Sequence, residues 1–201
     1  MFTIIKFVFI LAHIYAFVNR GHKYAILSLY YQVSIIIIMI TKEQYIESLS
    51  KEFAIIKHLG EKVKPEQLSH KPTEKQRTTQ ELMHYLTYIF AAGTESIVTS
   101  DTDAWKKYTE APVPTHENFV SLMNDEESKV LEFLSGVTEE NLAEELHMWG
   151  RTQSKALHLL GLHNIAVAYK MQLFLYLKQS GTENIGTMNL WAGMDQPPAV
   201  K

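Results

Sequence analysis

The side chains with the clearest capacity for chemistry are two histidines and a carboxylate that lie in helical patterns. His84 follows Glu81 by three residues, and His158 lies in a long apolar segment further along the chain. Imidazole and carboxylate groups bind divalent metals and transfer protons near neutral pH. Helical spacing allows Glu81 and His158 to face inward from two neighbouring helices, where they either form a polar contact or supply two metal ligands. Two ligands without a third make an incomplete metal site.

Composition and motifs exclude several other chemistries. The chain has no cysteine, which excludes disulfides, thiolate zinc sites and cysteine nucleophiles and fits a cytoplasmic protein. Gly150 and Gly161 stand in no phosphate-binding loop, dinucleotide fingerprint or nucleophile elbow. The 19 basic and 22 acidic residues give a net charge of −3, which offers no strong attraction for nucleic acid. We therefore expect no nucleic-acid partner.

The first forty residues differ in composition from the rest of the chain. They contain no Asp or Glu, and their only formal charges are Lys6, Arg20 and Lys23. Two apolar runs of 17 residues each, 2–18 and 24–40, flank a short polar stretch. All 22 acidic residues follow this leader, together with 16 of the basic residues (19 less 3). The remainder of the chain therefore carries a net charge of −6.

Three interpretations of the leader stay open. In the first, residues 1–38 come from a misassigned translation start, and synthesis begins at Met39, where the sequence reads as the beginning of a soluble protein. In the second they form a membrane segment that tethers the protein, although the runs are short for a span and His13 and Gln32 are costly in lipid. In the third they are a signal peptide, although no clear cleavage site follows. We expect no membrane contact unless residues 1–40 are genuine.

Four helices are predicted after the leader, because apolar residues recur there every three or four positions. They run from Thr41 to Gly60, from Thr78 through Ile97, from Thr115 through Leu134, and from about Thr152 to Ser180. The apolar stripes of the first three contain Ile46, Leu49, Phe53, Ile56 and Val63, then Leu82, Leu86, Ile89 and Ile97, then Phe119, Leu122, Val130, Phe133 and Leu134. The fourth helix is apolar on nearly all sides, which places it centrally.

Local signals mark the ends and contacts of these helices. Thr78 and Glu81 match a capping box, and Gly181 occupies a common C-terminal capping position. Gly93 is interpreted as a close-packing point within one continuous second helix, because the periodicity continues beyond it.

The segments between the helices lack periodicity. Residues 99–114 and 135–152 are predicted to be long loops, the second with one short turn, and no strand pattern of useful length is found. The expected fold is an all-α four-helix bundle over residues 39–181 whose long connections allow neighbours that are not consecutive in sequence. Residues 182–201 are predicted to form a C-terminal tail packed on the bundle.

Two segments resemble the DinB-like superfamily of four-helix bundles, which includes the YfiT-type enzymes. Residues 77–86 (RTTQELMHYL) are similar to its helix-two signature of Ser/Thr, Glu-Leu-Leu and His-Leu. Residues 165–177 (IAVAYKMQLFLYL) are similar to its helix-four signature, His-x-x-x-His-Arg-Gly-Gln-Leu followed by Tyr-Leu. The resemblance spans residues 42–181, and the tail 189–195 (NLWAGMD) is similar to a branch without the usual histidines.

The resemblance implies a metal site whose ligands are missing here. Typical members bind a divalent metal with one histidine from helix two and two from helix four, and alignment places these positions at Tyr85, Ile165 and Tyr169. Ile165 cannot ligate, and neutral phenols are poor ligands for zinc or nickel. The two tyrosines are expected to fill the old cavity, either as a plug or in contact with a small polar ligand. His84, His158 and Glu81 are the alternative ligands if the alignment is shifted.

The functional prediction is accordingly a DinB-like protein with a degenerate metal site and a non-catalytic binding or structural role. No cofactor and no catalytic residue are expected, and the resemblance implies a homodimer. The alternative is a metal- or thiol-dependent transferase or hydrolase of the DinB/YfiT type that uses a noncanonical site with zinc or nickel. A membrane-tethered bundle is the remaining alternative if residues 1–40 are genuine.

Overall fold

The computed structural model describes residues 40–196. The three interpretations of the leader therefore fall outside the described residues and stay predictions. Within residues 40–196, no helix is both long and apolar enough to cross a bilayer.

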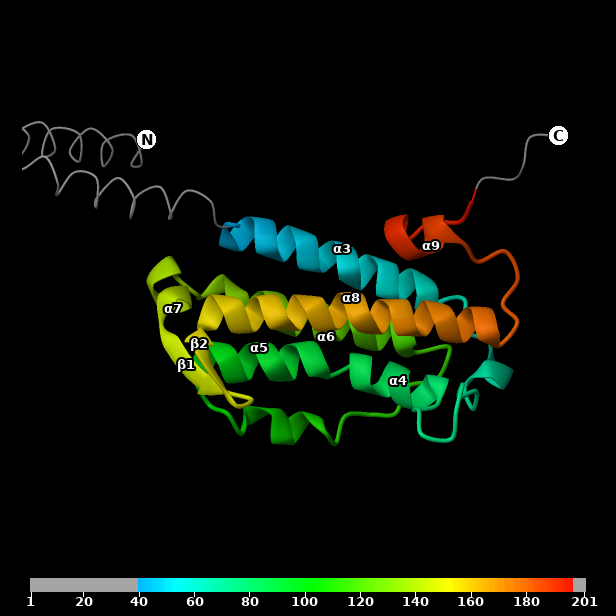
Figure 1. Cartoon of the computed structure of the whole chain (residues 1–201), viewed down its shortest axis with the longest axis horizontal. Coiled ribbons are helices and arrows are strands. Elements are labelled where there is room, and N and C mark those ends of the chain that lie inside the picture. Colours follow the sequence, from blue (N-terminus) through cyan, green and yellow to red (C-terminus); the bar gives the residue numbers. More distant parts are fainter. Residues whose placement is uncertain (1–39, 197–201) are drawn as a thin grey trace, which may run out of the picture. The chain divides into compact units, whose positions relative to one another are not determined.

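The described chain is an all-α bundle with one small hairpin (Figure 1). In chain order its elements are α3 (Lys42–Gly60), η1 (Pro65–Gln67), α4 (Thr79–Leu86), α5 (Ile89–Thr99), η2 (Ala104–Tyr108), α6 (Phe119–Ser135), α7 (Glu139–Ala143), β1 (Glu145–Met148), β2 (Arg151–Ser154), α8 (Lys155–Gln179) and α9 (Thr187–Ala192). The bundle consists of α3, the α4–α5 pair, α6 and α8. Both α3 and α5 pack against α6 and α8, so α3 and α5 lie diagonally, as the long connections allowed.

The predicted stripes form the core. Phe53, Leu82, Phe119 and Leu134 are almost completely buried, and the long helix α8 contributes residues such as Leu173 and Leu177. The predicted close contact at Gly93 is confirmed, since a Cβ there would lie 2.6 Å from a methyl of Leu162 on α8.

Both predicted helix-end signals are confirmed. The Thr78 hydroxyl accepts the Glu81 amide at 3.1 Å, and the Glu81 carboxylate accepts the Thr78 amide at 2.7 Å. After the C-terminal end of α8, Gly181 has φ +87°, and the amide of Thr182 donates to the carbonyl of Leu177 at 2.9 Å. This second pattern is the hydrogen bonding of a Schellman motif.

The prediction of one continuous second helix is wrong, because the helix breaks between α4 and α5. The chain turns at Thr87 and Tyr88, and Tyr88 has the non-helical dihedrals φ −142° and ψ −19°. The new helix start is capped from α6, where the buried Glu126 carboxyl accepts the Ala91 amide at 2.7 Å. A carboxyl group 35 residues away thus supplies the partner that the break requires.

The two predicted loops also contain structure. Residues 99–114 include η2, and residues 135–152 include α7, where the short turn was expected, and β1. Strand β1 pairs with β2 in an antiparallel hairpin whose turn residues, Trp149 and Gly150, both have positive φ. Each strand has only four residues, too few for a strand pattern to stand out in the sequence. The prediction of a loop is therefore wrong where the hairpin forms.

The C-terminal tail packs on the bundle, as predicted. Helix α9 contacts α3 and α8, and Leu190 is buried against the core.

Candidate functional site

The two tyrosines that the resemblance aligned with metal ligands meet across two helices. The rings of Tyr85 on α4 and Tyr169 on α8 have centroids 5.1 Å apart and planes tilted by 59°. Tyr88, at the α4–α5 break, packs edge-on against Tyr85 at 5.5 Å. Ile165, one turn before Tyr169, packs on the core as a partly buried apolar side chain.

Arg77 completes this group, and we call Arg77, Tyr85, Tyr88 and Tyr169 the Arg77–tyrosine cluster. The Arg77 guanidinium carbon lies 4.3 Å from the Tyr85 ring centroid and 5.7 Å from that of Tyr169. Its Nη1 donates a hydrogen bond of 3.3 Å to the Tyr169 hydroxyl. Arg77 itself is exposed, so the guanidinium forms the outer side of the cluster.

Two side chains of α8 hold the backbone of Arg77 at this place. The hydroxyl of the buried Tyr176 donates to the carbonyl oxygen of Arg77 at 3.1 Å, and Gln172 donates to the Tyr176 hydroxyl at 2.7 Å. The capping box begins at the next residue, Thr78. The backbone of Arg77 is therefore anchored to α8 and to the start of α4 at once.

Tyr85 and Tyr88 of the cluster have raised pKa values. Burial, and then the neighbouring Tyr169, raises the pKa of Tyr85 to about 12. Burial also raises the pKa of Tyr88. Both groups stay protonated at neutral pH, where they can donate or accept hydrogen bonds but cannot act as bases.

The two polar residues of α4 that were alternative ligands have other partners. His84 Nε2 lies 2.8 Å from the carbonyl oxygen of Ala111, to which it donates, and the imidazole packs edge-on against Tyr88. The Glu81 carboxylate is exposed and serves the capping box.

His158 belongs to the hairpin and not to the cluster. It is 2% exposed, its Nδ1 accepts from Gln153 Nε2 at 3.3 Å, and its Nε2 donates to the carbonyl of Leu146 at 3.0 Å. The hairpin and α4 lie toward opposite ends of the bundle (Figure 1). Glu81 and His158 therefore do not form the contact that helical spacing allowed.

The structure thus brings together Tyr85 and Tyr169 but separates Glu81, His84 and His158. Between residues 40 and 196, no three His, Asp or Glu side chains gather closely enough to hold a metal ion.

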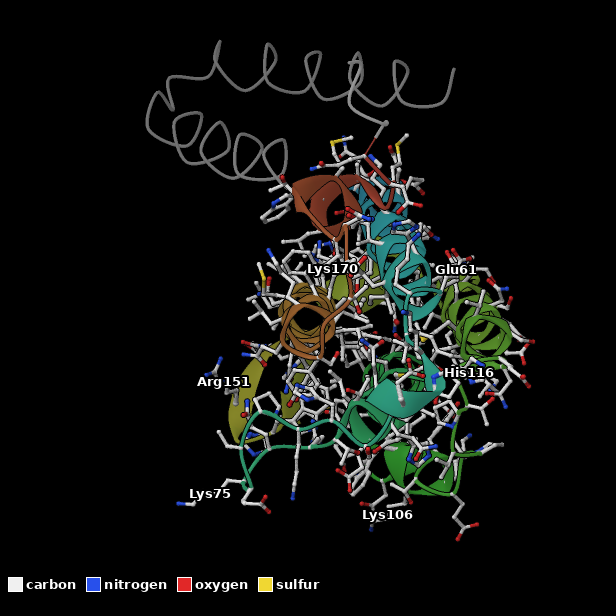
Figure 2. The ribbon with its side chains drawn as sticks, turned by 90° about the vertical axis from the view of Figure 1, so that its right-hand side faces the viewer. Glu61, Lys75, Lys106, His116, Arg151 and Lys170 are labelled. Carbon is white, nitrogen blue, oxygen red and sulfur yellow. The ribbon has the colours of Figure 1, made fainter. Side chains whose placement is uncertain are left out.

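Sequence reasoning missed a buried ion pair between α8 and α3. Lys170, next to Tyr169, is 2% exposed, and its Nζ lies 2.6 Å from a carboxylate oxygen of Glu52 on α3. Figure 2 shows Lys170 inside the bundle, whereas Lys75, Lys106 and Arg151 lie at its periphery. The Trp191 ring of α9 lies 5.2 Å from the same ammonium group. The signal in the sequence for this ion pair was a lysine within a helix that is apolar on nearly all sides.

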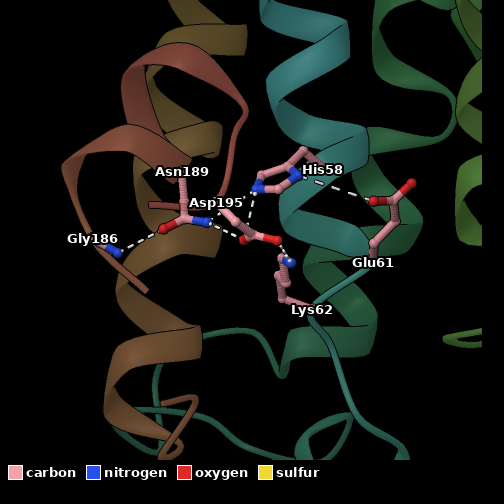
Figure 3. Close-up of polar contacts among 6 residues, drawn as sticks. All are labelled: His58, Glu61, Lys62, Gly186, Asn189 and Asp195. Atoms are coloured by element: carbon pink, nitrogen blue, oxygen red, sulfur yellow. Dashed lines mark hydrogen bonds and ion pairs between the residues drawn. The ribbon is translucent and has the colours of Figure 1, made fainter. Parts of the chain in front are cut away.

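A second polar network, which the sequence did not indicate, fastens the tail (Figure 3). The buried Asn189 of α9 donates to Asp195 Oδ1 at 2.9 Å and to His58 Nε2 at 3.0 Å, and its Oδ1 accepts the Gly186 amide at 2.8 Å. Lys62 pairs with Asp195 at 2.7 Å. Hydrogen bonding to Lys62 is the main cause that lowers the pKa of Asp195.

Comparisons with known proteins identify the fold. No model of a protein family matches the sequence, and no curated protein sequence matches it. The structure is similar to the crystal structure of a DinB-like protein, YjoA, from Bacillus subtilis, with TM-score 0.62 and 19% identity over 71% of this chain and 96% of that one. It is also similar to a DinB-like protein from Bacillus cereus ATCC 10987, with TM-score 0.57 and 17% identity over 72% of this chain and 96% of that one. The fold of this protein is therefore the DinB-like fold that the two sequence segments predicted.

Proposed function

We propose that this protein is a non-catalytic binding protein, and that the Arg77–tyrosine cluster is its binding site in place of a metal centre. The observation that carries the proposal is the Arg77 guanidinium, which lies 4.3 Å over the Tyr85 ring and donates to the Tyr169 hydroxyl. The guanidinium lies next to two of the three residues that align with metal ligands, and its charge changes what the site can bind.

The side chains of the cluster do not fit a divalent metal. Two tyrosines and an isoleucine stand at the aligned positions, and neutral phenols are weak ligands for zinc or nickel. A divalent ion at these hydroxyls would also lie close to the permanently charged guanidinium. At an effective dielectric constant of about 20, a +2 and a +1 charge about 5 Å apart repel by on the order of 6 kcal/mol. These four residues therefore disfavour a metal centre and the chemistry that depends on one.

The same features suit a small anionic ligand. One guanidinium Nη1 reaches Tyr169, and among residues 40–196 no carboxylate forms an ion pair with Arg77. The remaining N–H groups of an exposed guanidinium can bind a carboxylate or phosphate in two parallel hydrogen bonds. The contact with the Tyr85 ring and the bond to Tyr169 restrict the guanidinium group, which reduces the entropy lost on binding. The ligand class is therefore a small molecule with a carboxylate or phosphate group.

The test combines metal analysis with thermal unfolding of the full chain, purified without a histidine tag. We expect no stoichiometric metal by elemental mass spectrometry and no change of Tm with zinc or nickel. A panel of small carboxylates and phosphates should contain compounds that raise Tm with concentration. A ligand at one hundred times its Kd adds about 2.7 kcal/mol of stability, which corresponds to a rise of roughly 5–10 °C.

Two arginine variants decide whether the cluster is the site. Arg77→Ala should abolish the rise in Tm, and Arg77→Lys should weaken it because an ammonium group lacks the planar fork. Arg151→Ala is the matched control, since Arg151 is an exposed arginine of the hairpin, which lies toward the opposite end of the bundle from α4 (Figure 1). Stoichiometric zinc or nickel would overturn the proposal and favour the metal-dependent transferase or hydrolase. A rise in Tm that survives Arg77→Ala would place binding elsewhere.

A further inference from the structure

A continuous row of aromatic rings extends from the Arg77–tyrosine cluster along α4. Its members, which we call the aromatic row, are Tyr169 of α8 followed by Tyr85, Tyr88 and His84. In that order, the centroids of neighbouring rings are 5.1, 5.5 and 5.4 Å apart. All four side chains are partly buried, so each keeps some surface in contact with solvent. Such a row is a surface on which the body of a bound small molecule can pack.

Hydrogen bonds fix both ends of the aromatic row. At one end the Tyr169 hydroxyl accepts from Arg77 at 3.3 Å. At the other end His84 Nε2 donates to the carbonyl oxygen of Ala111 at 2.8 Å, which ties the row to the segment that follows η2. The rings between these ends contact one another edge-on or at a tilt. The surface is therefore formed before a ligand arrives, which reduces the entropy lost on binding.

The middle of the row has a free polar group beside the guanidinium. Within residues 40–196, the Tyr88 hydroxyl has no hydrogen-bond partner. Burial raises the pKa of Tyr88, and the positive charge of Arg77 acts in the opposite direction, so the two groups lie within electrostatic reach of each other. The guanidinium is exposed and lies over the Tyr85 ring, so its other face is open for stacking on a ligand ring.

The chemistry of the row discriminates between possible ligand bodies. A sugar would bury several hydroxyl groups that each need a partner, whereas the row offers three phenols and one imidazole, and Tyr169 and His84 are already hydrogen-bonded. An aliphatic acid would gain the burial of apolar area only. An aromatic ring would gain the same area and, in addition, edge-to-face contacts with the tyrosine rings. The row therefore favours an aromatic body.

We infer that the ligand of this site is an aromatic anion, whose carboxylate or phosphate group binds Arg77 and whose planar ring packs on the aromatic row. This inference rests on the proposed function, because it specifies the body of the ligand whose anionic group Arg77 binds. It assigns the choice of head group to the guanidinium and the choice of body to the rings. Tyr88 is the residue that decides the body, since its ring lies at the centre of the row between Tyr85 and His84.

Three carboxylates with different bodies test this inference on the full chain. Benzoate, cyclohexanecarboxylate and acetate share the head group, and the Kd of each is measured by ligand-observed NMR titration. The Kd of benzoate should be at least about fivefold lower than that of cyclohexanecarboxylate, because ring contacts add to the burial of area. Acetate should bind more weakly than both. Phenyl phosphate and methyl phosphate repeat the comparison with the other head group.

Two variants of Tyr88 separate the ring from the rest of the site. Tyr88→Leu keeps an apolar side chain but no ring, and should reduce the preference for benzoate to about twofold or less without changing the Kd of acetate. Tyr88→Phe keeps the ring and should keep the preference. Trp105→Leu is the matched control, since Trp105 is a 43% exposed aromatic residue of η2 outside the row, and should keep the wild-type Kd values.

The outcomes distinguish this inference from the proposed function. Equal Kd values for benzoate and cyclohexanecarboxylate, with all binding lost in Arg77→Ala, would overturn the aromatic ligand and leave the anion site standing. A preference for benzoate that survives Tyr88→Leu would also overturn the role of the row. If none of the carboxylates or phosphates binds, the proposed function and this inference are both wrong.

Discussion

Glu126 is the ionisable side chain whose state matters most to the core. It is fully buried on α6, where Oε1 accepts the Ala91 amide, and among the described residues Oε2 has no hydrogen-bond partner. Burial is the main cause that raises the pKa of Glu126 to about 8. Tyr108 of η2 and Lys129 of the same helix are the other titratable groups that act with it. The helix cap is thus a neutral carboxylic acid at pH 7.

This shift makes stability depend on pH in a defined direction. Between the unfolded pKa of about 4.5 and the folded pKa of about 8, native Glu126 holds a proton that the unfolded chain releases. The free energy of unfolding therefore falls as pH rises through this window, by up to a few kcal/mol at about 1.4 kcal/mol per pKa unit. Glu126→Gln keeps an acceptor for Ala91 but cannot ionise. As pH rises, the free energy of unfolding of this variant should therefore fall less than that of the wild type.

Urea unfolding at pH 5, 6.5 and 8 measures this difference. The matched control is Asp125→Asn, which changes the exposed neighbouring carboxylate and should keep the wild-type pH dependence. Equal slopes for the wild type and Glu126→Gln would show that Glu126 does not carry the effect.

At the scale of elements, two glycines at helix ends differ in the space that surrounds them. Gly60 ends α3 where a Cβ would collide with the fully buried ring of Phe119 on α6. Gly136 follows α6, has φ −85°, and would accept a Cβ with no atom within 4 Å. The missing side chain is therefore needed for the close approach of α3 to α6 at Gly60, but not at Gly136.

Gly60→Ala should destabilise the protein by at least about 2 kcal/mol, because a buried aromatic ring has no free space to move into. Gly136→Ala should leave the free energy of unfolding within about 0.5 kcal/mol of the wild type, or raise it slightly by restricting the unfolded chain. Urea unfolding of both variants provides the measurement. Similar losses in both would contradict the close contact between α3 and α6.

At the scale of the whole molecule, one amide joins the tail to the bundle. Asn189 binds Asp195 and Gly186 within the tail and His58 on α3 (Figure 3). The contact with His58 Nε2 is the bond that joins the tail to α3. Asn189 itself is 1% exposed, and its loss would remove a hydrogen-bond partner from the partly buried His58 ring and Gly186 amide.

Asn189→Ala should release α9 without unfolding the bundle. Amides in residues 182–196 should exchange with solvent at least tenfold faster, while those of α3, α6 and α8 keep their protection. Hydrogen exchange followed by mass spectrometry measures both regions in one experiment. Glu183→Ala, which changes an exposed residue of the same tail, is the control and should leave exchange unchanged. Unchanged exchange in Asn189→Ala would mean that apolar contacts of Leu190 suffice to hold the tail.

Local patterns in the sequence determined the helices and their ends. Periodicity of three and four residues predicted α3, α6 and α8, and the capping box at Thr78 and the glycine at 181 marked ends that the structure confirms. These features are predictable because each depends on residues within one or two turns of one another. The alignment of Tyr85 and Tyr169 with the metal-ligand positions of the DinB-like superfamily also came from sequence, through the resemblance.

Only the tertiary structure decided the features that depend on distant residues. Glu126 accepts the Ala91 amide at the start of α5 from 35 positions away, Glu52 of α3 pairs with Lys170, and Arg77 reaches Tyr169 across 92 positions. Such contacts leave no periodic trace, since any side chain of suitable charge on a neighbouring element could make them. Sequence thus determined which helices form, whereas packing decided where one of them breaks and which cation lies beside the two tyrosines.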